Sequence, residues 1–421
     1  MHDDLMTQQN TLDKQRMDPV TSKKRLLMVS CITTLQFISM MIMRQNAPLY
    51  LESIGASELA VGSVVAAFAL LPLLISLPGG VLMDRIGYRS VILFGSGSMV
   101  AASVALAFLP STPVVLVTQL VAGLANILVI LATQAYVSNL GDSSQRTQNF
   151  AFWSISFGVG LLVGPPIAGV LEDLWGYAIA FLGAGVVSAL VMLISTRLVE
   201  IAPVGSEKVR VVDLVRVVRR EVPQITKVSG SFLKNPVVQL SIGVSVCVLF
   251  VITLRASFYL VYLERLDFSS TRIGLLVATQ EAFALLFRPF LAPMIRRFGA
   301  VPLMVASLVV GGVGMAAVSF SYTFGAQVFA AMLSGLAPAF TQPISMILMS
   351  ASAPDDLQGT ALGFRQMANQ APLFVGPLFF GVISTLLGLR AVFIVAGAVL
   401  IVGAFVLLFA RGYVREAVGE F

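Results

Sequence analysis

Long apolar segments, separated by short polar connections, run through almost the whole chain. Each is close to the roughly 20 residues that a helix needs to cross a bilayer. Helices are favoured over barrel strands because the segments are long and continuously apolar, and because a helix satisfies its own backbone hydrogen bonds in lipid. The pattern predicts an all-α membrane protein with twelve transmembrane helices, over residues 26–51, 58–80, 90–109, 113–138, 150–171, 178–197, 236–263, 272–294, 301–320, 324–352, 359–385 and 390–410.

Charged residues give these helices an orientation. The chain has 27 Lys and Arg residues. Most of them fall in the two polar tails, in the 197–235 segment and in the loops at 81–89, 141–149 and 295–299, which follow even-numbered helices. Basic residues concentrate on the cytoplasmic side, so we expect a multi-pass protein of the plasma membrane, a bacterial inner membrane, with both termini in the cytoplasm. The net charge of +6 then reflects topology and contact with anionic lipid, and it favours no nucleic-acid partner.

A single offset of 212 residues aligns the two halves of the chain, which predicts two pseudo-symmetric six-helix bundles. The pairs at this offset are Gly62 with Gly274, Gly87 with Gly299, Gly123 with Gly335, and Gly164-Pro165 with Gly376-Pro377. The expected domains are a cytoplasmic tail at 1–25, a six-helix bundle at 26–197, a basic cytoplasmic linker with an amphipathic helix at 198–235, a second six-helix bundle at 236–411 and a cytoplasmic tail at 412–421.

Several kinds of chemistry are not expected. Cys31 and Cys247 lie in apolar segments, and the only histidine, His2, lies in the polar N-terminal tail. We therefore expect no disulfide, metal site or cofactor. No clustered nucleophile or phosphate-binding loop points to an enzyme or to a nucleotide-driven pump. Secondary transport is the expected class, with a non-transporting membrane sensor as a distant alternative.

Two motifs carry a resemblance to a known family. GVLMDRIGYRS lies between the second and third predicted helices, and GLLVGPPIAG lies in the fifth. The matching positions are Gly80, Asp84, Arg85, Gly87 and Arg89 in the first motif, and Gly160, Gly164, Pro165 and Gly169 in the second. On these motifs the chain resembles, over about residues 26–410, a twelve-helix transporter of the major facilitator superfamily, most like its drug:proton antiporter branch.

The resemblance implies a role for each motif. The first implies a conformational latch in which Asp84 faces the start of the eleventh helix, near residues 358–360, where a carboxylate can interact with a helix dipole. A basic hairpin without a switching role is the alternative. The second motif is usual in exporters, although its glycines also fit close helix packing. Gln119 stands where the family has an arginine associated with proton coupling, a departure that bears on the standard coupling route.

Charged side chains inside the predicted helices carry the remaining functional information, since each costs about 2.5–3.5 kcal/mol on insertion scales unless it faces a cavity or a partner. Arg44 and Arg255 are expected to approach the central cavity from opposite halves. The candidate substrate-binding residues are Arg44, Asn46, Arg255, Tyr259, Arg365 and Asn369, and the candidate for proton coupling is Glu281. The alternative for each arginine is a structural role, in which it binds carbonyl oxygens or polar side chains.

A cavity with three arginines and one acid is net positive and suits an anionic or zwitterionic ligand. The sequence therefore predicts a secondary active transporter that works by alternating access, as a proton-coupled exporter of an amphipathic or anionic small molecule. Broad multidrug efflux and lipid or glycolipid flipping are the alternatives. The expected partners are the small-molecule substrate, protons and membrane lipid, and we expect a monomer.

Overall fold

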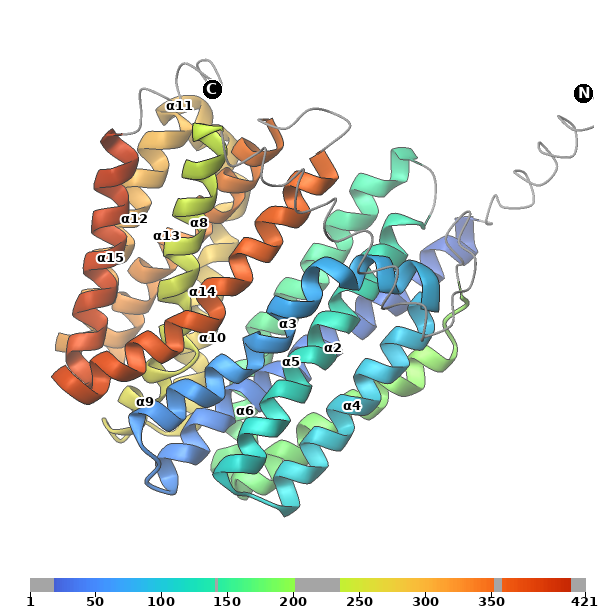
Figure 1. Ribbon diagram of the computed structural model, residues 1–421, viewed down its shortest axis with the longest axis horizontal. Helices are drawn as coiled ribbons and strands as arrows, with labels where there is room; N and C mark the ends of the chain where they lie inside the picture. Colours follow the sequence, from blue (N-terminus) through green and yellow to red (C-terminus); the bar gives the residue numbers. More distant parts are fainter. Residues whose placement is uncertain (1–18, 141–142, 201–234, 352–357, 410–421) are drawn as a thin grey trace, which may run out of the picture.

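The computed structural model describes residues 19–140, 143–200, 235–351 and 358–409, and within these ranges its regular elements are helices (Figure 1). The first half contains α2 (Pro19–Ser53), α3 (Glu58–Ile86), α4 (Tyr88–Phe108), α5 (Thr112–Ser138) and α6 (Ser143–Thr196). The second half contains α8 (Pro236–Arg255), α9 (Phe258–Glu264), α10 (Ser270–Phe287), η1 (Arg288–Phe290), α11 (Leu291–Phe298), α12 (Ala300–Ala317), η2 (Val318–Phe320), α13 (Phe324–Ala351), α14 (Gln358–Leu387) and α15 (Leu389–Phe409).

The described helices supply the twelve predicted crossings. Ten of them are long and apolar enough to span a membrane, and the bent pair of α10 and α11 makes an eleventh span. The twelfth comes from α6, which breaks at Gly176 with φ 78° and ψ 174° and so contains two consecutive helices. The expected linker at 198–235 and the two expected tails lie largely outside the described residues.

Several expected boundaries were wrong in an informative way. Helix α3 continues to Ile86, so the loop expected at 81–89 contracts to the single non-helical residue Gly87. The predicted seventh helix breaks directly after Arg255, and the predicted eighth is bent by 62° where η1 joins α10 to α11. A run of apolar residues indicates that a segment lies in lipid, but it does not indicate where the helix bends.

Four glycine turns confirm the internal repeat. Each of these turns lies between two helices and has a glycine with φ between 78° and 96°, namely Gly87, Gly176, Gly299 and Gly388. Glycine adopts this region readily and other residues avoid it. Gly87 pairs with Gly299, and Gly176 pairs with Gly388, at the offset found in the sequence. The two halves therefore use the same turn chemistry at equivalent places.

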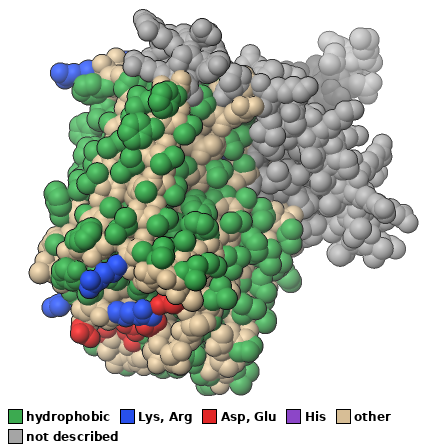
Figure 2. Space-filling view, turned by 60° about the vertical axis from the view of Figure 1, so that its left-hand side comes forward, with side chains coloured by type: hydrophobic (Ala, Val, Ile, Leu, Met, Phe, Trp, Pro, Cys, Tyr) green, Lys and Arg blue, Asp and Glu red, His purple; other side chains and the backbone are tan. Residues whose placement is uncertain are grey.

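Helix α2 begins and α15 ends on one face of the molecule, which we call the terminal face (Figure 1). The two halves meet mainly through α6 against α10 and α3 against α14. Figure 1 shows these helices converging at the other face, which we call the opposite face, and diverging toward the terminal face. On the face that Figure 2 shows, hydrophobic side chains spread over the middle of the described surface and charged side chains lie toward its two ends, as a membrane-spanning body requires.

Small residues allow the helices of each bundle to approach closely. A side chain at Gly123 of α5 would overlap the carbonyl oxygen of Phe68 in α3, and one at Gly311 of α12 would overlap Ala337 in α13. Such contacts stabilise helix pairs in lipid, where the apolar tails of the bilayer supply little hydrophobic driving force between helices. They fix the bundles that hold the charged residues in place.

Candidate functional site

Arg44 of the first half lies within electrostatic range of Arg255 and Glu281 of the second half. Arg44 comes from α2, Arg255 is the last residue of α8, and Glu281 lies in α10. An Arg255 Nη2 atom lies 3.7 Å from Glu281 Oε1. The Arg44 guanidinium lies within electrostatic range of both other groups, attracted by Glu281 and repelled by Arg255. We call these three residues the central charge cluster.

The two arginines of the central charge cluster have different partners. Arg255 forms the ion pair with Glu281 inside the second half, and its residue is 9% exposed. Arg44 instead lies over the ring of Phe68 in its own half, with 5.4 Å between Cζ and the ring centroid. The Nε atoms of both arginines are buried without a hydrogen-bond partner among the described residues. The cluster therefore keeps unused hydrogen-bond donors at the interface between the halves.

Asn46 and Tyr259, both predicted to bind substrate, lie inside the bundles. Asn46 is fully buried, and its Nδ2 donates to the carbonyl oxygen of Ala168 in α6 at 3.4 Å. Tyr259 is 2% exposed, and its hydroxyl donates to Gln327 Oε1 at 3.4 Å. Both side chains join neighbouring helices of one half, so in this conformation their contacts are structural.

Arg365 and Asn369 belong to a hydrogen-bonded network of α8, α13 and α14. Arg365 Nη2 donates to Gln342 Oε1 at 2.8 Å and to Ser245 Oγ at 3.2 Å, and its Nε donates to Ser345 Oγ at 3.1 Å. Ser245 also donates to Asn369 Oδ1 at 2.8 Å. Neutral oxygen atoms of the second half therefore hold Arg365, which is not among the charges that act on Arg44 or Arg255.

The fifth-helix motif serves two interfaces. Gly160 and Gly164 let α6 approach α2, because side chains there would overlap Phe37 and Met41. Gly169 instead faces the second half, where a side chain would overlap the carbonyl oxygen of Ser270. Pro165 presents its own carbonyl oxygen to Gly274 of α10. One half of the motif therefore packs a bundle, and the other half closes the two bundles against each other.

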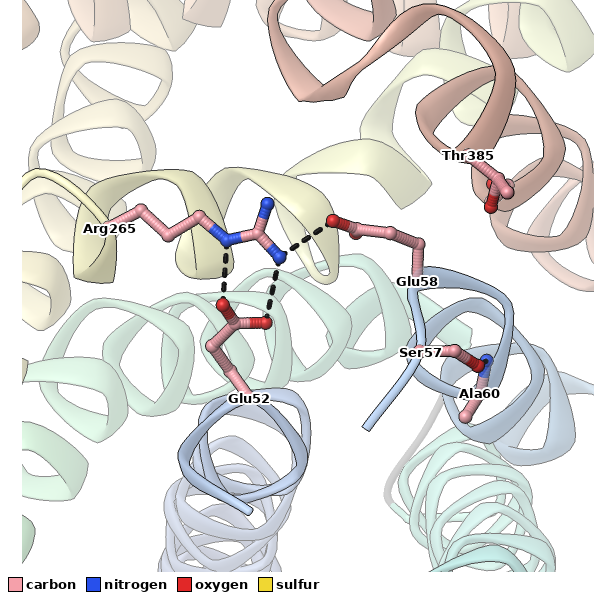
Figure 3. Close-up of polar contacts among 7 residues, drawn as sticks. Glu52, Ser57, Glu58, Ala60, Arg265 and Thr385 are labelled. Carbon is pink, nitrogen blue, oxygen red and sulfur yellow. Dashed lines mark hydrogen bonds and ion pairs between the residues drawn. The ribbon is translucent and has the colours of Figure 1, made fainter. Parts of the chain in front are cut away.

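Sequence reasoning missed a cluster of ion pairs at the opposite face (Figure 3). Arg265, between α9 and α10, donates from Nε to Glu52 Oε1 at 2.6 Å and from Nη2 to Glu52 Oε2 at 3.1 Å. Its Nη2 also lies 2.6 Å from Glu58 Oε1. The hydrogen bond to Glu52 raises the pKa of Arg265, so the group stays charged. These three residues, the opposite-face clamp, join the two halves.

Two further polar contacts join the halves at the opposite face. The two carboxylate oxygens of Asp173 accept the backbone N–H groups of Ser270 at 2.9 Å and Thr271 at 2.8 Å, at the start of α10. The Tyr177 hydroxyl donates to Glu264 Oε1 at 3.3 Å. The sequence signal for these contacts was the group of acids near the helix ends. Together with the clamp they show a conformation that is closed at the opposite face.

The loop motif is only partly described. Gly80, Asp84 and Arg85 lie in the last turns of α3, and the Asp84 and Arg85 side chains lie outside the described ones, as do those of residues 358–360. The backbone N–H of Arg89 donates to Glu200 Oε1 at 3.3 Å, and this carboxylate lies against Gly87. Glu200 therefore sits at the N-terminus of α4, where a negative charge is favourable.

Gln119, at the position where the resemblance implies an arginine, lies buried on α5. It is 1% exposed, and its Nε2 has no hydrogen-bond partner among the described residues. It stands one helical turn before Gly123, which contacts the backbone of Phe68. A neutral amide thus occupies the helix that packs behind the aromatic partner of Arg44.

Comparisons with known proteins agree with this architecture. The chain is 26% identical over 326 residues to the class C tetracycline resistance protein of Escherichia coli, covering 75% of this chain and 78% of the relative. It is 22% identical over 348 residues to the quinolone resistance protein NorA of Staphylococcus aureus, covering 79% and 83%. A solved bacterial homolog of the human lysosomal transporter Spinster, in an inward-facing and unoccupied conformation, shares the fold with a TM-score of 0.74, 14% identity and coverage of 95% and 97%.

The family assignment rests on almost the full length of the chain. The sequence model of the Major Facilitator Superfamily matches residues 29–264 and again residues 240–419. The first match contains the whole first half and extends through α8 and α9, and the second match covers nearly all of the second half. The chain belongs to the Major Facilitator Superfamily and is a multi-pass membrane transporter, not an enzyme.

Proposed function

We propose that this transporter exports an amphipathic or anionic small molecule in exchange for protons, by alternating access. The observation that carries the proposal is the central charge cluster, in which two arginines and one glutamate meet between the halves. Two guanidinium groups with unused donors form a positive site suited to carboxylates, sulfonates or phosphates. The closed opposite face fits a state whose site is reached from the terminal face.

Broad drug efflux is the second candidate. The tetracycline and quinolone resistance proteins match most of this chain at 26% and 22% identity. Their names favour export as the direction of transport. A screen of anionic, zwitterionic and cationic compounds in proteoliposomes separates the two candidates, because broad efflux predicts transport of lipophilic cations and the positive cluster predicts their exclusion.

Proton coupling is proposed to depend on Glu281. Of the described acids, Glu281 is the one placed far from both faces, and its side chain is 33% exposed. Glu281 is paired with Arg255 of its own half, whereas Arg44 belongs to the other half. Movement of the halves therefore changes the distance between Glu281 and Arg44, and with it the electrostatic surroundings of this carboxylate. We expect Glu281→Gln to abolish accumulation driven by a pH gradient and to preserve downhill exchange. Asp267→Asn, the same chemical change at an exposed site on the opposite face, is the control. Gradient-driven transport at the wild-type rate in Glu281→Gln would refute this role.

The loop motif is proposed to act as a latch at the terminal face, which we assign to the cytoplasm of a bacterial inner membrane. The basic side chains of this face, including Arg89, Arg197, Arg296 and Arg297, support this orientation. We expect Asp84→Asn to reduce transport severely and to leave expression and membrane insertion near normal. Full flux in this variant argues against the latch, and a reporter fused to either terminus tests the orientation independently.

A further inference from the structure

Arg44 is a half-buried cation whose Nε is buried without a hydrogen-bond partner among the described residues. Its guanidinium forms no hydrogen bond with the described residues, and its Nε is shielded from solvent without a partner. The contact with Phe68 is a cation–π interaction, which uses none of the N–H donors of Arg44. Because a buried donor without an acceptor is unfavourable, the edge of Arg44 is prepared for an acceptor that the chain itself does not supply.

The charges of the cluster do not balance. Among the described side chains, Glu281 is the one carboxylate facing Arg44 and Arg255, and its close contact is with Arg255. Arg365 is held in its own network by Ser245, Gln342 and Ser345, and it is not among the charges that act on Arg44 or Arg255. With Glu281 ionised, the cluster carries a net charge of one positive unit at a half-buried position, where an unbalanced charge is unfavourable.

We propose that the site selects monoanions, and that its single unbalanced charge sets this selectivity. One carboxylate or sulfonate on Arg44 makes the loaded site neutral, whereas a dianion or a cation leaves a net charge. The planar donor edge of Arg44 suits the oxygen pair of such a group, and the Phe68 ring gives the adjoining surface apolar character. This inference rests on the proposed function and assigns its substrate class.

The charge count also sets the energetics of transport. When the loaded, neutral site changes its access from one side of the membrane to the other, no net charge moves. When the empty site changes back, one positive charge moves. Export of a monoanion is therefore driven by an inside-negative membrane potential, whereas one-for-one exchange of the same anion is insensitive to it. If Glu281 also carries a proton inward, as proposed above, the return step moves two charges instead of one.

Binding to the purified full-length protein tests the charge rule directly. The probes are p-toluenesulfonate as the monoanion, naphthalene-1,5-disulfonate as the dianion and tetraphenylphosphonium as the cation, measured by calorimetry. We expect the wild type to prefer the monoanion, and Glu281→Gln, which adds one net positive charge, to shift the preference toward the dianion. Arg255→Gln removes the unbalanced charge and should weaken monoanion binding roughly thirtyfold.

A double variant separates charge from folding. Arg255→Gln combined with Glu281→Gln restores one net positive charge on Arg44, so we expect it to regain most of the monoanion binding that Arg255→Gln loses. Arg272→Gln removes an exposed arginine at the opposite face and should leave all three affinities unchanged. Failure of the double variant to regain binding, while it stays folded, overturns the charge rule, as does an unchanged probe preference in Glu281→Gln.

Transport in proteoliposomes distinguishes this inference from the proposed function. We expect exchange of labelled p-toluenesulfonate to ignore a potassium–valinomycin potential, and net efflux to accelerate when the vesicle interior is negative. If binding follows the charge rule but the protein moves none of the probes, the proposed function is wrong. If exchange occurs and net efflux ignores the potential, the proposed function stands and the inference fails.

Discussion

The interface of α6 with α10 and the interface of α3 with α14 are pseudo-symmetric, and they differ in how they are closed. Their backbone contacts correspond residue by residue at the repeat offset. Gly274 lies against the carbonyl oxygen of Pro165 in the first, and Gly62 lies against that of Pro377 in the second. Close packing of glycine against a proline carbonyl is therefore a shared property of both interfaces.

Polar contacts distinguish the two interfaces. Asp173 accepts two backbone N–H groups at the start of α10, across the boundary between the halves. The equivalent residue of α14 is Thr385, whose hydroxyl donates to Gly381 in its own helix. At the start of α3, Glu58 instead pairs with Arg265 of the second half (Figure 3). Duplication kept the packing of the two interfaces, while the groups that hold them closed diverged.

The largest expected effect comes from the tight glycine of the first interface. Gly169→Ala would place its Cβ against the carbonyl oxygen of Ser270, whereas Gly381→Ala would place it 3.4 Å from that of Glu58, an ordinary contact. Overpacking costs about 1–3 kcal/mol, so we expect Gly169→Ala to shift the population strongly away from the state closed at the opposite face.

Electron double resonance between spin labels at the exposed residues Leu109 and Phe320, with Cys31 and Cys247 replaced by serine, measures this shift. Gly381→Ala is the matched control, because both substitutions change helix propensity equally. Equal responses of the two variants would mean that the interfaces are as alike in tightness as they are in topology.

An intermediate effect is expected for Asp173→Asn. The substitution removes the charge that faces the α10 N-terminus and retains one accepting oxygen. We therefore expect the free energy that favours the state closed at the opposite face to fall by about 1 kcal/mol. The same spin-label distance reads the result, and Thr385→Ala, at the equivalent position, should change it little. A larger change in Thr385→Ala than in Asp173→Asn would mean that polar groups hold the α3–α14 interface closed more strongly than the α6–α10 interface.

A smaller, salt-dependent effect is expected for Arg265→Gln. The arginine side chain is 44% exposed, so solvent and ions screen its attraction to Glu52 and Glu58, and we expect about 0.5–1 kcal/mol. The difference from wild type should shrink as salt is raised from 0.05 to 0.5 M, roughly a threefold shortening of the screening length. A difference that persists at high salt contradicts an ionic role.

The smallest expected effect is that of Tyr177→Phe. Its hydroxyl makes one hydrogen bond of 3.3 Å to Glu264, so we expect a loss of about 0.5 kcal/mol. Combined with Asp173→Asn it should be close to additive, because the two residues contact different partners. Strong non-additivity would show that the contacts at this interface act as one unit.

Much of the fold was predictable because its signals are local. Twelve apolar segments and glycines at one offset predict twelve helices in two bundles, and the structure and the family match confirm them. The positions of the helix breaks were not predictable. Arg255 ends α8 inside an apolar segment, where hydropathy is the same for a straight helix and a broken one.

The sequence identified the residues of the candidate site, but it did not show which of them lie near one another. Arg44, Arg255 and Glu281 stood out as charges within apolar segments, and they lie together between the halves. Arg365 stood out equally, yet it is held by neutral oxygens elsewhere in the second half. The charge of a residue is visible in the sequence, whereas its partners depend on the packing of distant helices.

The sequence by itself determined the membrane class, the duplicated bundles and the glycine turns, because lipid demands continuous apolar helices and because glycine alone readily adopts the turn geometry. The tertiary structure decided that Asp173 closes α10 and that Arg265 clamps Glu52 and Glu58. It also decided that Arg44 keeps an unused donor edge. The contacts of Asp173 and Arg265 join residues more than 90 positions apart, whose meeting follows from how two similar halves pack and leaves no local pattern in the chain.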